Sequence, residues 1–200
     1  RDHHTWIGPQ GRSWRKWLGL EHIEGSAGEP PRCQRLGKHG LVDHGSTEQK
    51  ARFLRPMFTG EERWFQLFSE PGAGSDFAGL GTRAIRDGDE WIINGQKVWN
   101  TLAHLADWGM LVTRSDPNQP KHKGMTYFAL DMKSPGVEVR PLRQITGEAE
   151  FNEVYLTDVR VPDSCRVGEV GEGWRASLTT LMNERNAIGA GSGTPPKRGS

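Results

Sequence analysis

Residues 90–99 read EWIINGQKVW, and their pattern decides the fold class. Apolar and polar residues alternate on both sides of Asn94-Gly95, and Asn-Gly is the dipeptide most typical of a two-residue hairpin turn. We therefore predict two short antiparallel strands that are joined at Asn94-Gly95.

More strand-like segments lie on both sides of this stretch. Alternation or a short apolar run predicts strands at 64–68, 82–86, 109–113, 125–131, 137–140 and 153–161. No helical pattern separates them, and strands in such a series form an antiparallel barrel or sandwich.

Helical patterns flank the strands. Ser46 suits the N-cap of a helix that Pro56 and Gly60 should end, and its core face should carry Ala51, Leu54 and Phe58. A second helix is expected over 174–188, with one face formed by Trp174, Leu178, Leu181, Met182 and Arg185. The fold class predicted is α+β, an antiparallel β-barrel flanked by helices.

Composition excludes several classes of partner. The formal net charge of +1 over 200 residues gives no basic field for nucleic acid. No run approaches the roughly 20 apolar residues of a membrane helix. Cys33 and Cys165 have neither metal-site spacing nor the density of a disulfide framework. We expect a soluble intracellular protein without nucleic-acid partner, membrane span or bound metal.

The two ends of the chain look unlike the middle. Residues 1–39 show neither helical nor strand periodicity, and we predict a poorly ordered segment there. The chain begins without Met and ends in GAGSGTPPKRGS, so we expect a piece of a longer protein.

The loop 66–76, QLFSEPGAGSD, is the first candidate binding site. Gly72 and Gly74 permit close backbone approach to a ligand, and Ser75 with free amides can donate to phosphate or carbonyl oxygens. The Walker and Rossmann fingerprints both fail, the second because Phe77 stands at the third glycine. A ligand loop and a plain turn that ends a strand both remain open.

Two further candidates lie at 99–101 and 184–185. Trp99 and Thr101 would share one side of an extended chain, where they could cover a flat ring and hydrogen-bond its edge. A buried core Trp is the alternative. Glu184 would serve as a base only if it lines a cavity, and otherwise Glu184-Arg185 is a surface pair.

Five motifs in order give a resemblance to a known family. They are SEPGAGSD, DEWIINGQKVWNT, FALDMKSPGVEVRPL, FNEVYLTDVRVP and VGEVGEGW, and the chain over 40–200 resembles the acyl-CoA dehydrogenase family of flavoproteins. The resemblance implies the end of an N-terminal helical domain at 40–62, a flavin-binding middle β-barrel at 63–165, and a linker with the first helix of a truncated C-terminal helical bundle at 166–200. Residues 1–39 would not belong to the family pattern.

The resemblance also implies a cofactor site for FAD. Trp99 would pack on the flavin, and Thr101 would hydrogen-bond its hydride-accepting nitrogen, with Asn100 between them. Phe68 and Ser69 would lie along the ring edge. The remaining implied cofactor contacts are Gln66, Gly74 and Ser75, although many relatives have an aromatic residue where Gln66 stands.

The activity implied is dehydrogenation of acyl-CoA thioesters, with α-proton abstraction by a glutamate and β-hydride transfer to FAD. Glu184 fits the Leu-x-x-Glu-Arg pattern of relatives with the base on this helix; others place it later in the chain. Arg185 and Ser75 would contact substrate. An electron-transfer flavoprotein would accept the electrons.

The same resemblance implies a homo-oligomer when full length, in the cytoplasm, or in the mitochondrial matrix of a eukaryote. The 200 residues alone should be inactive. Three alternatives stay open: an acyl-CoA oxidase, another flavin-dependent relative, and a β-sandwich binding module without catalysis.

Overall fold

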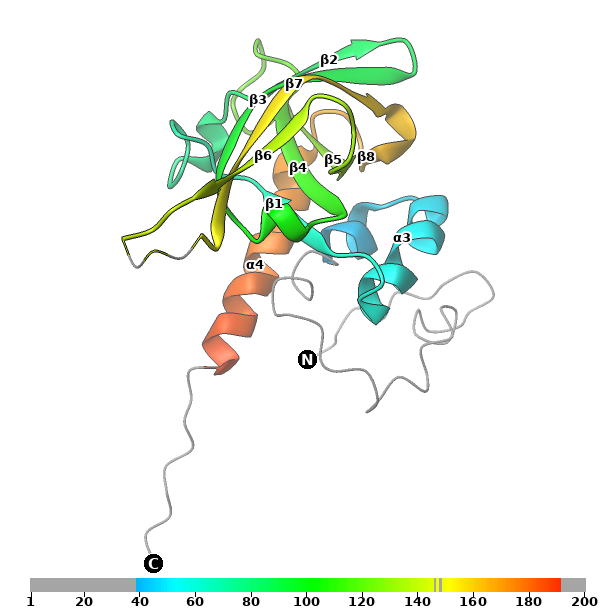
Figure 1. The fold of residues 1–200 in the computed structure, drawn as a ribbon. Coiled ribbons are helices and arrows are strands. Elements are labelled where there is room, and N and C mark those ends of the chain that lie inside the picture. Colours follow the sequence, from blue (N-terminus) through cyan, green and yellow to red (C-terminus); the bar gives the residue numbers. More distant parts are fainter. Residues whose placement is uncertain (1–38, 146, 148, 192–200) are drawn as a thin grey trace, which may run out of the picture.

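The computed structural model describes residues 39–191 except 146 and 148 (Figure 1). The segment 1–38, expected to be poorly ordered, and the tail 192–200 lie outside the described residues. Among the described helices, none combines the length and apolar character needed to cross a bilayer.

An eight-stranded sheet forms the centre of the described chain (Figure 1). Its strands are β1 (Trp64–Leu67), β2 (Arg83–Asp87), β3 (Glu90–Thr101), β4 (Trp108–Arg114), β5 (Met125–Asp131), β6 (Val137–Leu142), β7 (Phe151–Pro162) and β8 (Arg166–Val167). The order is β6-β7-β3-β2-β4-β5-β8, and β1 pairs with β4 beside this path. Most pairs are antiparallel, as predicted, but β1 and β2 each run parallel to β4. The α+β class is confirmed, and β8 was not predicted.

The predicted turn at Asn94-Gly95 is wrong. β3 runs through it as one strand of 12 residues, and the hairpin turn lies between β2 and β3, at Gly88 (φ 63°). The pairing of β3 with β7 shifts register between Ile93 and Gly95, which marks a bulge. A Cβ on Gly95 would lie 2.5 Å from the hydroxyl oxygen of Thr82, the residue before β2. A glycine at position 95 therefore allows Thr82 to lie close to β3.

Both faces of β4 and β5 are buried, because the sheet bends around one core and carries helices on its other side. Leu111 and Phe128 point into a cluster that includes Ile93 and Val159 from β3 and β7. Their neighbours on the same strands, Met110, Val112, Tyr127 and Ala129, point the opposite way, into a second cluster under the helices. Tyr127 in that second cluster shows the alternation expected of a strand.

Helix α3 (Thr47–Thr59) covers part of the second cluster, beside the sheet in Figure 1. The Ser46 hydroxyl accepts from the backbone amide of Gln49, and the side-chain oxygen of Gln49 accepts from the backbone amide of Ser46. These two bonds form a capping box. Gly60 ends the helix in the left-handed conformation (φ 77°), as predicted.

Two details of α3 differ from the prediction. Pro56 lies inside the helix, which continues to Thr59, and the proline removes one N–H donor from the helix without ending it. The predicted core face is shifted: Leu54 is buried, but Ala51 is exposed and Phe58 only partly buried. The buried residues are Gln49, Lys50, Phe53, Leu54 and Met57.

Helix α4 (Gly173–Gly191) packs on β5 with small residues instead of the predicted large ones. Ala176, Ser177 and Thr180 are buried, whereas Leu178 and Met182 are exposed. The predicted face of α4 is therefore wrong in part, although Trp174 and Leu181 pack against the core edge. Small side chains are buried on this face because the backbone of α4 lies close to β5, which leaves no room for large ones.

This close approach predicts a sharp sensitivity at the start of α4. A Cβ on Gly173 would lie 2.8 Å from backbone atoms of Met125 and Thr126, which cannot move without disturbing β5. We expect Gly173→Ala to lower the free energy of unfolding by about 1–3 kcal/mol. Urea denaturation measures it, with Gly74→Ala as control, since a Cβ on Gly74 meets nothing within 4 Å. Equal stability of the two variants would contradict the packing described.

Candidate active site

One pocket of about 190 Å³ brings together seven of the residues singled out from the sequence. It lies between the end of β1, the second half of β3 and α4. Its lining consists of Phe65, Gln66, Phe68, Ser69, Val98, Trp99, Asn100, Thr101 and Glu184. Residues 118 positions apart in sequence, Gln66 and Glu184, thus share one cavity.

Backbone hydrogen bonds hold the two strand ends of the pocket together. The Val98 amide donates to the Ser69 carbonyl oxygen at 2.9 Å. The side-chain amide of Asn100 donates to the Gln66 carbonyl oxygen, also at 2.9 Å. Asn100 is buried, so its side chain is a structural link at the back of the pocket.

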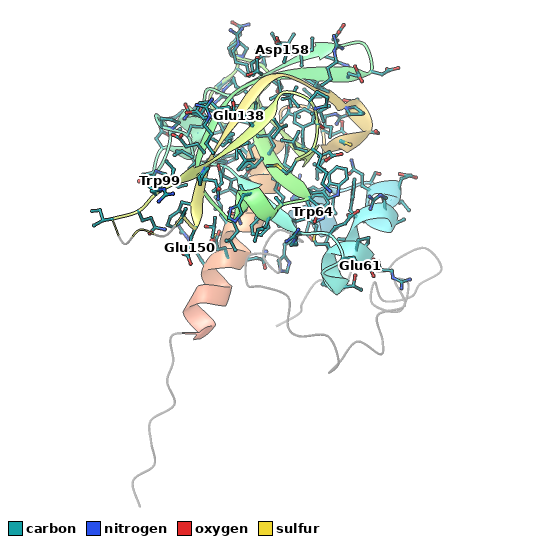
Figure 2. The ribbon with its side chains drawn as sticks, in the orientation of Figure 1. Glu61, Trp64, Trp99, Glu138, Glu150 and Asp158 are labelled. Atoms are coloured by element: carbon teal, nitrogen blue, oxygen red, sulfur yellow. The ribbon has the colours of Figure 1, made fainter. Side chains whose placement is uncertain are left out.

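A distortion of β3 exposes Trp99 to solvent. Its φ of 61° is rare for a bulky residue, and the register with β7 shifts between Lys97 and Asn100. The chain is therefore not extended at Trp99, contrary to the prediction. The residue is 62% exposed, and its ring makes an edge contact with Phe151, with centroids 5.9 Å apart. In Figure 2 Trp99 lies at the margin of the sheet. An exposed aromatic in a strained conformation is typical of a binding surface.

Two hydroxyl groups complete the pocket wall. The side chains of Ser69 and Thr101 line the cavity and make no hydrogen bond within the described residues. Each can donate and accept one, so the wall offers an aromatic face beside two free hydroxyls. Such a wall suits a flat ring with polar edges, the shape of the expected flavin.

Three predicted residues do not line this pocket. Gly74 and Ser75 lie on the exposed part of the loop after β1, and Arg185 is exposed on α4. The loop itself is a tight turn, because the backbones of Glu70 and Ala73 exchange hydrogen bonds of 3.0 and 3.1 Å.

An ion pair that the sequence did not reveal fixes this loop. Lys97 is fully buried, and its Nζ lies 2.7 Å from Glu70 Oε1. The ammonium also donates to the carbonyl oxygens of Phe68 at 3.2 Å and Val112 at 2.7 Å. Glu70 further accepts from the backbone amides of Gly81 and Thr82, at 2.6 and 3.0 Å. One lysine thus connects β3, β4 and the loop.

Burial and ion pairing have opposing effects on the pKa of each residue in this pair. Burial lowers the pKa of Lys97 to about 8, while the charge and hydrogen bond of Glu70 oppose that decrease. For Glu70, burial alone would raise the pKa, but the charge of Lys97 and the donated hydrogen bonds outweigh it and lower the pKa. A charged residue at a core position was the available signal in the sequence, but the bulge at Gly95 concealed which side chains of β3 point inward.

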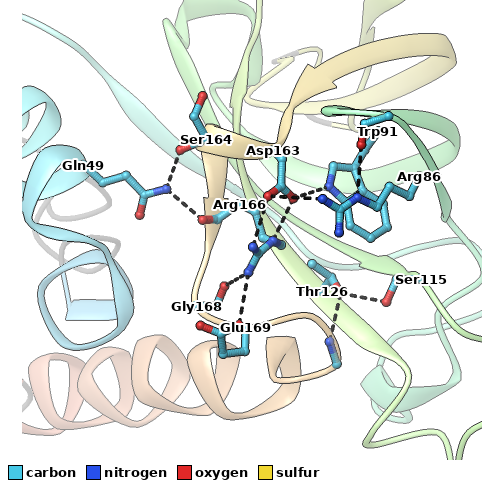
Figure 3. Close-up of polar contacts among 12 residues, drawn as sticks. Gln49, Arg86, Trp91, Ser115, Thr126, Asp163, Ser164, Arg166, Gly168 and Glu169 are labelled. Atoms are coloured by element: carbon cyan, nitrogen blue, oxygen red, sulfur yellow. Dashed lines mark hydrogen bonds and ion pairs between the residues drawn. The ribbon is translucent and has the colours of Figure 1, made fainter.

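A second polar cluster lies between α3 and the sheet and is structural (Figure 3). Arg166 pairs with Asp163 at 2.9 Å, and the Trp91 Nε1 donates to the same carboxylate at 2.7 Å. The pKa of Asp163 is lowered to about 2, mainly because Arg166 donates hydrogen bonds to its carboxylate. Gln49 donates to the carbonyl oxygens of Ser164 and Arg166, both at 2.7 Å, which ties α3 to the chain after β7. Within the described residues, no group of His, Cys, Asp and Glu could hold a metal ion.

The buried pair predicts an asymmetric response to mutation. Glu70→Gln leaves the Lys97 charge buried without a counter-charge, so we expect a loss of about 3–5 kcal/mol in the free energy of unfolding. The matched control is Asp76→Asn in the same loop, which breaks the exposed Asp76–Lys121 pair of 2.9 Å. That change should cost less than about 1 kcal/mol. Chemical denaturation compares the two, and similar losses would refute the anchoring role of Lys97.

Comparison with known proteins agrees with this geometry. The family model described as acyl-CoA dehydrogenase, middle domain, matches residues 66–159. The acyl-CoA dehydrogenase FadE34 of Mycobacterium tuberculosis is 54% identical over 152 residues, 76% of this chain and 21% of FadE34. The acyl-CoA dehydrogenase IpdE1 of the same organism is 46% identical over 145 residues, 72% of this chain and 38% of IpdE1.

Solved structures show the same fold. The Tcur3481-Tcur3483 steroid ACAD matches with a TM-score of 0.72 at 38% identity, over 76% of this chain and 39% of that chain. The glutaryl-coenzyme A dehydrogenase complex with glutaryl-CoA matches with a TM-score of 0.75 at 26% identity, over 80% and 41% of the two chains. The chain spans 21% to 41% of the length of these four proteins. Residues 66–159 form an acyl-CoA dehydrogenase middle domain, and the chain belongs to the acyl-CoA dehydrogenase family.

Proposed function

We propose that the whole protein dehydrogenates an acyl-CoA thioester with FAD as its cofactor. The observation that carries this proposal is the pocket itself, where the exposed ring of Trp99, two free hydroxyls and the Glu184 carboxylate lie together. Family membership supplies the reaction class, and the pocket supplies side chains that suit it.

The wall formed by β1 and β3 fits the flavin ring. Trp99 would pack against the ring, with Thr101 and Ser69 donating to its polar edge. Phe68, which lines the pocket from a buried position, would set the depth to which the ring enters. Bound FAD would supply the hydride acceptor. Ser75 and Gly74, on the exposed loop, would lie toward the CoA portion of the substrate, and Arg185 toward the same entrance.

Glu184 would act as the base that removes the α proton. It lies on α4 and Trp99 lies on β3, and both line the pocket, so substrate and flavin would be held between them. General base catalysis of this kind requires a carboxylate within reach of the proton and sheltered from bulk water. The half-buried side chain of Glu184 suits both needs.

The acyl group is proposed from the relatives. The steroid ACAD structure and the glutaryl-CoA complex both belong to proteins that share this fold, so bulky or carboxylated acyl groups are the first substrates to test. Electrons would leave through an electron-transfer flavoprotein, and the whole protein would work as an oligomer in the cytoplasm. An oxidase remains the second candidate, because the prolyl acyl carrier protein oxidase AnaB matches with a TM-score of 0.74 at 29% identity.

Replacement of the proposed base tests this function. In the FAD-loaded whole protein, we expect Glu184→Gln to lower kcat about 10³-fold while flavin content stays unchanged, since a neutral amide cannot accept the proton. Steady-state turnover of acyl-CoA with a dye as electron acceptor measures kcat. The exposed Glu48→Gln on α3 is the matched control and should retain full activity. Unchanged turnover in Glu184→Gln would show that the base lies elsewhere in the protein.

A further inference from the structure

We propose that Gln66 is a positioning residue for Glu184, and that its side chain does not serve as a flavin contact. The inference rests on the proposed function of Glu184 as the base. Its basis is the hydrogen bond of 3.3 Å from Gln66 Nε2 to Glu184 Oε2.

The alternation of β1 directs Gln66 toward α4. Trp64 and Phe68, two residues before and after it, belong to the cluster covered by the helices, whereas Leu67 points into the other core. Side chains two positions apart in a strand lie on the same face, so Gln66 faces α4. Its partial exposure, between buried neighbours, reflects the opening of the pocket at this point.

The backbone of Gln66 is held from two sides. On one side β1 pairs with β4, where Gln66 lies opposite Met110. On the other side the buried Asn100 donates its side-chain amide to the Gln66 carbonyl oxygen. The Gln66 amide therefore projects from a fixed point, which a positioning residue requires.

Glu184 depends on this contact. Within the described residues, the bond from Gln66 is the only hydrogen bond or ion pair that its carboxylate makes. The close packing of α4 on β5 runs from Gly173 to the buried Thr180, so Glu184 lies about one turn beyond it. Without the Gln66 side-chain amide, no hydrogen bond from the described residues would hold the Glu184 side chain in one rotamer.

The chemistry of the donor suits a base. An amide N–H stabilises the ionised carboxylate without bringing a positive charge that would compete for it. Bonding to Oε2 leaves Oε1 as the oxygen that accepts the proton. A lysine or arginine at position 66 would hold the carboxylate in an ion pair and weaken it as a base. A phenylalanine at this position could not donate in this way.

The test uses Gln66→Met in the FAD-loaded whole protein, because methionine keeps the length and loses the donor. We expect kcat about tenfold lower, KM within about twofold, and unchanged flavin content and visible spectrum. The isosteric Gln66→Glu guards against misfolding of the first variant. It should move the acidic half-maximum of kcat to higher pH, since a second carboxylate disfavours the ionised base.

A double-mutant cycle separates this inference from the proposed function. If Gln66 acts through Glu184, adding Gln66→Met to Glu184→Gln should change kcat by less than about twofold. Full activity of Glu184→Gln would remove the proposed base and this inference with it. An inactive Glu184→Gln beside a fully active Gln66→Met would overturn the positioning role alone. Loss of flavin from Gln66→Met would overturn it too, and would make Gln66 a cofactor contact.

Discussion

The buried lysine of β3 is the constraint on which the rest of the site depends. Lys97 brings its ammonium to Glu70 and to carbonyl oxygens of Phe68 and Val112, so a single side chain joins three segments. Pocket residues lie directly beside both members of the pair: Phe68 and Ser69 precede Glu70, and Val98 and Trp99 follow Lys97. A buried charge is costly unless it is paired and hydrogen-bonded, and here every donor direction of the ammonium has a partner. The arrangement fixes the spacing between β1 and β3, and therefore the width of the pocket.

Helices α3 and α4 contribute differently to the structure around this sheet. α3 closes the second core cluster with a capped and well-packed helix, tied to the chain after β7 by Gln49. α4 lies close to β5 through small residues and then carries Glu184 to the pocket rim, where Gln66 meets it. The sheet thus provides the wall of the pocket, and the helix provides the carboxylate that we propose as the base. This separation lets the position of the carboxylate depend on one hydrogen bond.

Much of this arrangement was predictable where local signals act alone. The strand at 125–131 has the predicted bounds because a mostly apolar run with both faces buried leaves little ambiguity. Ser46 and Gly60 were placed correctly because capping chemistry is local. The motif resemblance singled out seven residues that line one pocket.

The remaining features depended on tertiary contacts that no local pattern contains. Asn94-Gly95 has the composition of a turn, but the approach of Thr82 made it a bulge. The face of α4 was misjudged because the nearness of β5 favours small side chains over large ones. The conformation of Trp99 and the burial of Lys97 follow from the same shifts of register in β3, which hydrophobic alternation does not reveal.

A crystal structure of the whole protein with FAD tests the proposed role of the pocket most directly. We expect the flavin ring against Trp99, with the Ser69 and Thr101 hydroxyls within hydrogen-bond distance of its edge. We also expect Glu184 to line a cavity that can admit an acyl chain. A flavin bound elsewhere, with Trp99 turned into a protein core, would contradict this role of the pocket.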